Sequence, residues 1–253
     1  MHRILYLLLF PVLVFGQTAQ ETIDRKLTFA KEQFQTTNEN NFVVATPYIK
    51  SYAGIAGSSF WATDVWSSAE LLYKGKMYQV SELKYDCAND LMVIPSYTKD
   101  GIQLLNLSPN IYPDIYINIK HTGNQHGKMT SDIPVTREHF MFYQSTKDEK
   151  SEGVPSGYYH FLIEKTISLL CKYSSNIVER SNLKAFEEAE TFYLQNDGKL
   201  LKIHRVGSFV EAFPLLKDKI NRFVEENNIN TQVSLNFDTI EKLIEFLNTQ
   251  SSK

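Results

Sequence analysis

Histidines in the middle and later parts of the chain are the first residues whose types suggest chemistry. His121 and His126 are five positions apart in a polar stretch that also holds Asp132. Zinc sites use characteristic short spacings of His and Cys, and a spacing of five without a nearby Cys matches none of them. We therefore predict surface or hydrogen-bonded histidines rather than metal ligands at five positions: His121, His126, His139, His160 and His204.

Two aspartates that flank a short polar segment form the second candidate. Asp86 and Asp90 would suit acid–base catalysis or calcium binding, but a calcium loop needs more oxygen ligands than Asp86, Asn89 and Asp90 supply. Asp and Asn also favour tight turns, because their side chains bond to nearby backbone groups. We favour the turn interpretation.

The two cysteines, Cys87 and Cys171, lie in alternating apolar stretches, so both thiols should point inward. In an oxidising compartment they would form a disulfide if their Cα atoms lay within about 7 Å. The alternative is two buried free thiols that pack as small apolar groups. Both possibilities stay open. A catalytic thiol is not expected, because a reactive cysteine needs exposure and a basic neighbour.

The remaining chemical signals are weak. The sequence contains no glycine-rich phosphate loop, no G-x-S-x-G motif and no H-E-x-x-H motif, and we expect no cofactor. Aromatic residues make up 13% of the chain, and Trp61, Trp66, Tyr112 and Tyr116 are candidates to line a ligand groove. Such residues are more often core residues or cross-strand pairs.

The first sixteen residues have the three parts of a secretory signal peptide. Arg3 precedes an apolar run from Ile4 to Phe15, which is too short to span a membrane, and cleavage is predicted after Gly16. We therefore expect an exported protein, in the periplasm or outside the cell and not in the cytoplasm. The net charge of −3 argues against a nucleic-acid partner, and no later stretch is long and apolar enough for a transmembrane segment.

Three regions are predicted for the mature chain, residues 17–253, which we treat as one domain. Apolar residues spaced by three and four predict an N-terminal helix over residues 17–37. Alternating patterns and tight turns predict an antiparallel β region over 71–206. Capping patterns at Ser208–Glu211 and Asp238–Glu241 predict two helices within 208–250.

The segments "GSSFWATDVWSSAELLYKGKMYQVSELKYDCANDLMVI", "GYYHFLIEKTISLLCKYS" and "AETFYLQNDGKLLKIHRV" carry a family likeness. Together with the final helices, they resemble an uncharacterised family of secreted Bacteroidota proteins. The resemblance implies a signal peptide, an antiparallel β region with an "LKYD" strand, and two C-terminal helices. It implies no activity, and because Cys87 departs from the family pattern, a disulfide would not be a family feature.

These features predict an α+β fold, in which an antiparallel β-meander, as a curved sheet or partial barrel, packs against an N-terminal helix and two C-terminal helices. For function, we favour a non-enzymatic binding module of the cell envelope that takes a partner protein or an apolar ligand. A structural or accessory envelope subunit is the second hypothesis. The third is an extracytoplasmic hydrolase, which requires several of His121, His126, His139, Asp86 and Asp90 to converge in one cleft.

Overall fold

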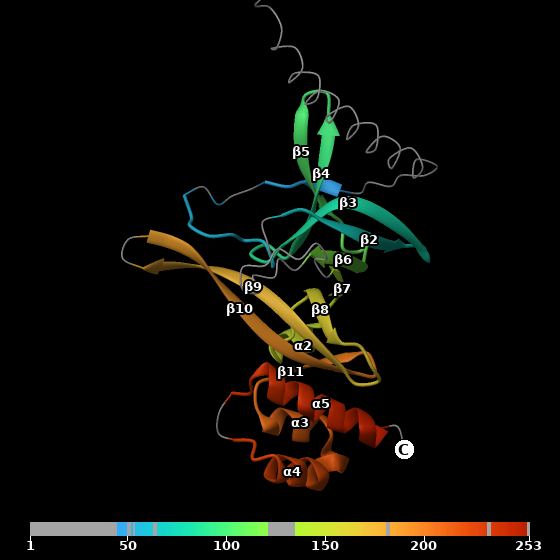
Figure 1. Ribbon diagram of the computed structural model, residues 1–253, viewed down its shortest axis with the longest axis vertical. Coiled ribbons are helices and arrows are strands. Elements are labelled where there is room, and N and C mark those ends of the chain that lie inside the picture. The colour runs from blue at the N-terminus through green and yellow to red at the C-terminus, as the bar shows by residue number, and fades with distance from the viewer. Residues whose placement is uncertain are drawn as a thin grey trace, which may run out of the picture.

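Eleven antiparallel strands form one open, curved sheet in the computed structural model (Figure 1). The structure describes residues 45–49, 52, 54–62, 65–120, 135–180, 183–231 and 234–251. The predicted combination of an antiparallel sheet with C-terminal helices is confirmed. The predicted signal peptide at 1–16 and the predicted helix at 17–37 lie outside the described residues.

The bounds of the elements are as follows. The strands are β1 Ala45–Pro47, β2 Ser67–Tyr73, β3 Lys76–Asp86, β4 Leu91–Thr98, β5 Gly101–Leu107, β6 Asp114–Lys120, β7 Val135–Tyr143, β8 Gly157–Ile163, β9 Ser168–Arg180, β10 Leu183–Asn196 and β11 Lys199–Ile203. The helices are α2 Lys147–Ser151, α3 Val206–Ala212, α4 Lys217–Glu226 and α5 Phe237–Ser251, with the 3₁₀ helix η1 Pro214–Leu216 directly before α4.

Two runs of hairpins replace the single meander that the sequence predicts. The spatial order is β1-β5-β4-β3-β2-β6-β7-β8-β9-β10-β11, so β2 to β5 form one run and β6 to β11 form the other. The chain returns after β5 to place β6 beside β2, where Leu71 pairs with Ile115. The period-two pattern locates each strand, but it does not say which strands distant in sequence will pair.

A packed core lies against the curved sheet. Strand β3 contributes to it and changes its partner along its length. Its first part pairs with β2, and its last residues, Lys84 to Asp86, pair with β4. Side chains from both runs therefore meet in one buried cluster. Its members include Leu71, Leu83, Tyr85, Met92, Ile115, Ile117, Phe140 and Tyr158.

The C-terminal helices pack against the end of the sheet formed by β8 to β11 (Figure 1). Ile220 of α4 and Leu243 of α5 join Leu169 of β9 and Leu194 of β10 in a second buried cluster. Asn248 fixes α5 in place, because its side-chain amide accepts from Ile167 N and donates to Ile167 O, each at 2.9 Å. The helices therefore cover this end of the sheet, as predicted.

The helix caps differ from the predicted ones. Ser208 lies inside α3, which begins after Arg205 without a side-chain cap. In α5 the capping side chain is Asn236, whose Oδ1 accepts from Thr239 N at 3.0 Å, rather than Asp238. Both predicted caps are therefore wrong in detail, because α3 begins before Ser208 and α5 begins before Asp238.

A capping box does occur at the start of the short helix α2. Thr146 accepts from Glu149 N, and Glu149 accepts from Thr146 N, at the start of α2. Pro95 lies within β4, although proline cannot donate to the hydrogen bonds of a sheet. The β3–β4 pairing covers only the first residues of β4, so Pro95 pairs with Leu104 of β5 where no other strand needs its missing N–H.

One carboxylate joins the two runs of strands. Asp90, in the turn between β3 and β4, accepts hydrogen bonds from Tyr85 Oη at 2.7 Å, Tyr158 N at 3.2 Å and Lys172 Nζ at 2.8 Å. Gly157, at the start of β8, leaves the space for this contact. An added Cβ at Gly157 would overlap both Asp90 Oδ2 and Lys172 Nζ, and its φ of +148° is rarely adopted by other residues.

We predict that Gly157→Ala lowers the free energy of unfolding by about 3 kcal/mol, because the new methyl group must displace a half-buried ion pair from a strained backbone position. Urea denaturation measures the change. Gly75→Ala is the matched control, because Gly75 also has a positive φ (+74°) but has nothing within 4 Å of an added Cβ. Equal losses in the two variants would contradict the proposed role of the space at Gly157.

Candidate functional site

One face of the central sheet carries a row of stacked side chains across β6, β7 and β8. Tyr116 and His139 are cross-strand partners, and their ring centroids lie 4.3 Å apart with planes at 14°. Phe161 stacks with His139 at 4.6 Å, and the guanidinium carbon of Arg137 lies 3.9 Å from the Tyr116 ring centroid. We call Arg137, Tyr116, His139 and Phe161 the stacked row.

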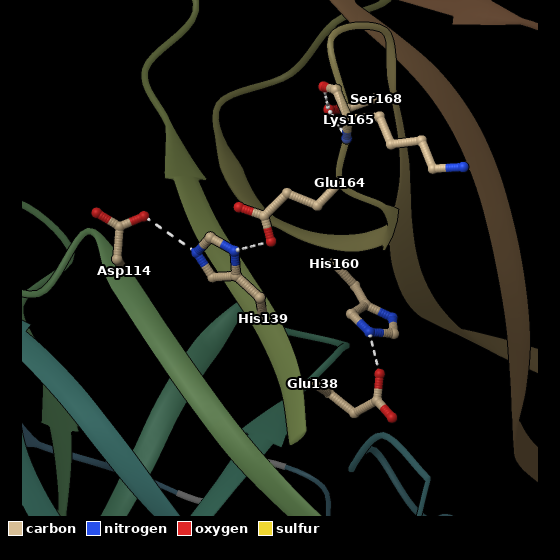
Figure 2. A network of polar contacts seen from close by, with 7 residues as sticks. All are labelled: Asp114, Glu138, His139, His160, Glu164, Lys165 and Ser168. Atoms are coloured by element: carbon tan, nitrogen blue, oxygen red, sulfur yellow. Dashed lines mark hydrogen bonds and ion pairs between the residues drawn. The ribbon is translucent and has the colours of Figure 1, made fainter. Parts of the chain in front are cut away.

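Carboxylates flank the stacked row. Figure 2 shows His139 between Asp114 at the start of β6 and Glu164 in the turn after β8. The Nε2 atom of His139 lies 3.3 Å from Asp114 Oδ1, and its Nδ1 atom lies 3.1 Å from Glu164 Oε2. Arg137 forms an ion pair with Glu70 of β2. Together with these carboxylates, the row connects β2, β6, β7 and the end of β8 through ion pairs, hydrogen bonds and ring stacking.

The surroundings of His139 favour its protonated form over the neutral form that a general base needs. Burial disfavours its charged form, but hydrogen bonds and charge attraction from Asp114 and Glu164 outweigh that effect and raise the pKa of His139 above its ordinary value. A general base needs an unprotonated nitrogen directed at the reacting group. Both ring nitrogens of His139 already face carboxylates, so its arrangement suits cross-strand attachment better than proton abstraction.

His160 lies on the opposite face of the sheet and is only 4% exposed. Its Nε2 atom is 2.7 Å from Glu138 Oε2, and its Nδ1 atom is 3.0 Å from Tyr173 Oη. Its ring stacks on Phe140 at 4.8 Å, and Trp61 lies edge-on at 5.2 Å. His160 is therefore the hydrogen-bonded histidine that the sequence analysis expects.

No nucleophile lies beside either histidine in the network of Figure 2. Ser168, the hydroxyl drawn in Figure 2, donates to Lys165 O at 2.7 Å and accepts from Lys165 N, so it closes the β8–β9 turn. An activated serine would instead donate to a histidine nitrogen. The described part of this network therefore lacks the nucleophile–base pair of a triad.

The convergence that the hydrolase hypothesis requires is not seen among the residues described. Asp86 accepts from Tyr48 Oη, Ala88 N and Asn89 Nδ2, which is turn chemistry with one longer-range contact. The described hydrogen bonds of Asp86 and of Asp90 do not include His139. The remaining candidates, His121 and His126, lie outside the described residues, and His204 is exposed as predicted.

The aromatic candidates have separate positions. Tyr112 is buried in the core, and Trp61 packs against the same cluster. Trp66 has the Lys84 ammonium 4.9 Å from its ring, and Tyr116 belongs to the stacked row. Trp61 and Tyr112 therefore belong to the core, whereas Trp66 and Tyr116 each lie beside a basic side chain. The described residues also contain no group of three or more His, Cys, Asp or Glu side chains arranged to hold a metal ion.

Sequence reasoning missed the acidic partners of the histidines. Asp114, Glu138 and Glu164 bind His139 or His160 across strands or from a turn. The alternation of Arg137, Glu138 and His139 does predict that Arg137 and His139 share one face and Glu138 the other. The partner across the strand depends on the register, which the alternation does not supply.

Both cysteines are buried free thiols in the structure. Burial raises the pKa of the Cys171 thiol to about 12 and raises that of Cys87 further. Nearby acidic residues, Glu190 for Cys171 and Glu188 for Cys87, act in the same direction. The expected inward direction is confirmed, and the disulfide between Cys87 and Cys171 stays a prediction that a thiol titration decides.

Comparisons with protein-family models, curated proteins and solved structures found no match to this chain. Within the part of the chain that the structure describes, every helix is too short or too polar to cross a membrane.

We predict that the stabilisation from His139 depends on pH. Because its folded pKa is raised, the contribution is fully present below the ordinary histidine pKa of about 6.5 and is lost as the pH rises through the folded value. His139→Gln should therefore destabilise the protein more at about pH 5.5 than at about pH 9, measured as the shift in urea midpoint. The exposed His204→Gln is the control, and an equal loss from His139→Gln at both pH values would refute the prediction.

A second prediction concerns the thiols. Because both are buried with raised pKa values, we expect the native protein to react slowly with a thiol reagent near neutral pH. After unfolding without reductant, two thiols should titrate rapidly. If the unfolded, unreduced protein shows no titratable thiol, the Cys87–Cys171 disulfide exists and the free-thiol assignment is wrong.

Proposed function

We propose that this protein is an exported, non-enzymatic binding module of the cell envelope and that its partner is another protein. Export rests on the signal-peptide pattern of residues 1–16. The observation that carries the choice of partner is the β9–β10 ribbon, which extends from the packed sheet as an exposed pair of strands (Figure 1).

The packed core argues against an apolar ligand held inside the curve of the sheet. Side chains from both runs of strands fill that space, and large residues such as Tyr85, Tyr112 and Phe140 are almost fully buried there. Ligand sites of this kind are concave and lined by apolar side chains that the ligand itself covers. Here the apolar side chains already cover one another.

The polar network argues against the hydrolase alternative. His139 and His160 each have both ring nitrogens next to partners, and the turn hydroxyl of Ser168 is bonded to the backbone of Lys165. These groups fasten strands to one another. A binding module needs such rigid attachments, because a stable scaffold lowers the entropic cost of binding.

The accessory-subunit alternative draws support from the same ribbon. Leu183 is 71% exposed and Ile177 is 46% exposed near its end. Apolar side chains on a projecting element suit permanent assembly with another chain. A permanent subunit and a reversible binding module differ in stoichiometry and in exchange, both of which can be measured.

Native mass spectrometry of the protein purified from its source tests the proposal. We expect a chain beginning at Gln17 that carries a second protein, whereas the same chain produced alone and purified identically should carry none. Partner exchange within minutes indicates a binding module, and a fixed complex that does not exchange indicates a subunit. Purification with only a lipid, small molecule or metal ion, or with nothing, would overturn the protein-binding proposal.

A further inference from the structure

Strand β10 has an unpaired stretch along its outer edge. Its inner edge pairs with β9 from Leu183 to Gln195. On the outer edge, β11 pairs only with residues 192–196, and Ala56 bridges to the strand at Ala185. Between these two contacts, no described strand pairs with residues 187–191 on the outer side, and residues 187–190 are all exposed. We call residues 187–191 the open edge.

The backbone of the open edge is directed toward solvent. Lys184 O accepts from Ala56 N at 2.9 Å, and Phe186 N donates to Ala56 O at 3.0 Å, so these even-numbered residues face the outer side. Because backbone groups alternate in direction along a strand, Glu188 and Glu190 present their N–H and C=O groups on that side as well. The contacts on either flank show that this edge has the geometry for pairing.

The side chains of the open edge are rich in glutamate, and their negative charge favours a basic partner. Glu187 forms an ion pair with Arg180, whereas Glu188 and Glu190 have no ion-pair partner among the described residues. Their side chains share one face, because they are two positions apart. A second copy pairing here would place like charges opposite each other, and a strand with basic residues at alternate positions would place opposite charges there.

A buried polar atom lies on the same face. Ser175 is the cross-strand partner of Glu188 and is 6% exposed. Its hydroxyl has no hydrogen-bond partner among the described residues. Buried polar groups are normally paired, so the Ser175 hydroxyl next to Glu188 lacks the hydrogen bond that such a group usually makes.

We propose that the open edge binds an extended segment of a partner protein, with Lys or Arg at alternate positions, as an added β-strand. Backbone hydrogen bonds to Glu188 and Glu190 supply the pairing, and the two carboxylates supply the preference for a basic sequence. The open edge offers five residues, which corresponds to about 17 Å of added strand. This inference rests on the proposed protein-binding function and assigns that function to one site.

The test uses the full mature protein and a synthetic peptide in which Lys alternates with Thr and Val. We expect salt-sensitive binding, with NMR amide shift changes concentrated at Phe186–Phe192. The same peptide with Glu in place of Lys should not bind. A peptide N-methylated at alternate amides keeps its charge but loses hydrogen-bond donors, so it should bind about tenfold more weakly. Equal binding of the methylated peptide would overturn strand addition.

Charge variants identify the site. Glu188→Lys with Glu190→Lys should abolish binding of the Lys peptide and permit binding of the Glu peptide. The control is Glu225→Lys with Glu226→Lys, which changes the net charge equally at exposed positions of α4, outside β10. Circular dichroism checks that both double variants fold. Equal losses in the two would show nonspecific attraction and overturn the site.

Two further outcomes separate this inference from the proposed function. If the native partner remains bound to the Glu188→Lys, Glu190→Lys protein and the wild-type protein does not bind the Lys peptide, the binding function stands and the open edge is not its site. If the wild-type protein self-associates and the double variant does not, the edge pairs with a second copy, and the basic-partner inference falls.

Discussion

The carboxylate of Asp90 joins the two runs of strands a second time, at a point outside the β2–β6 pairing. It accepts from Tyr85 in its own run and from Tyr158 and Lys172 in the other, which lie 68 and 82 positions away in sequence. A partly buried carboxylate that loses its donors becomes an unpaired charge, which is costly. Gly157 provides the space for this contact, so a glycine at the start of one strand and an aspartate in a distant turn form one structural unit.

The polar residues of the neighbouring strands also form contacts between strands. With the two runs fixed, β7 places His139 on one face and Glu138 on the other, and Glu138 binds His160 beside the core. His139 is bonded in turn by carboxylates from β6 and from the turn after β8. The titratable groups of the central sheet therefore connect strands, and our proposal assigns the interaction with a partner to the open edge of β10 instead.

The sequence predicts local structure well here and long-range structure poorly. The hairpin turn at Lys74-Gly75, the alternating strand around Ile117 and the helix after Pro214 all follow from local conformational preference and periodicity. The return of β6 to β2 and the partners of Asp90 and His139 depend on register, which local patterns leave undetermined. Asp90 illustrates both cases. Its place in a turn is predicted from the local sequence, but its contact with Lys172 of another hairpin is not.

An open sheet must protect its edges, and this protein does so in several ways. The short strand β1 covers part of β5, Pro95 occupies a stretch of β4 that has one neighbour, and the C-terminal helices cover the end formed by β8 to β11. The open edge of β10 is instead protected by charge. Glutamates prevent pairing with an identical strand but do not prevent pairing with a basic one. A charged edge is therefore selective, whereas a covered edge is closed to every partner.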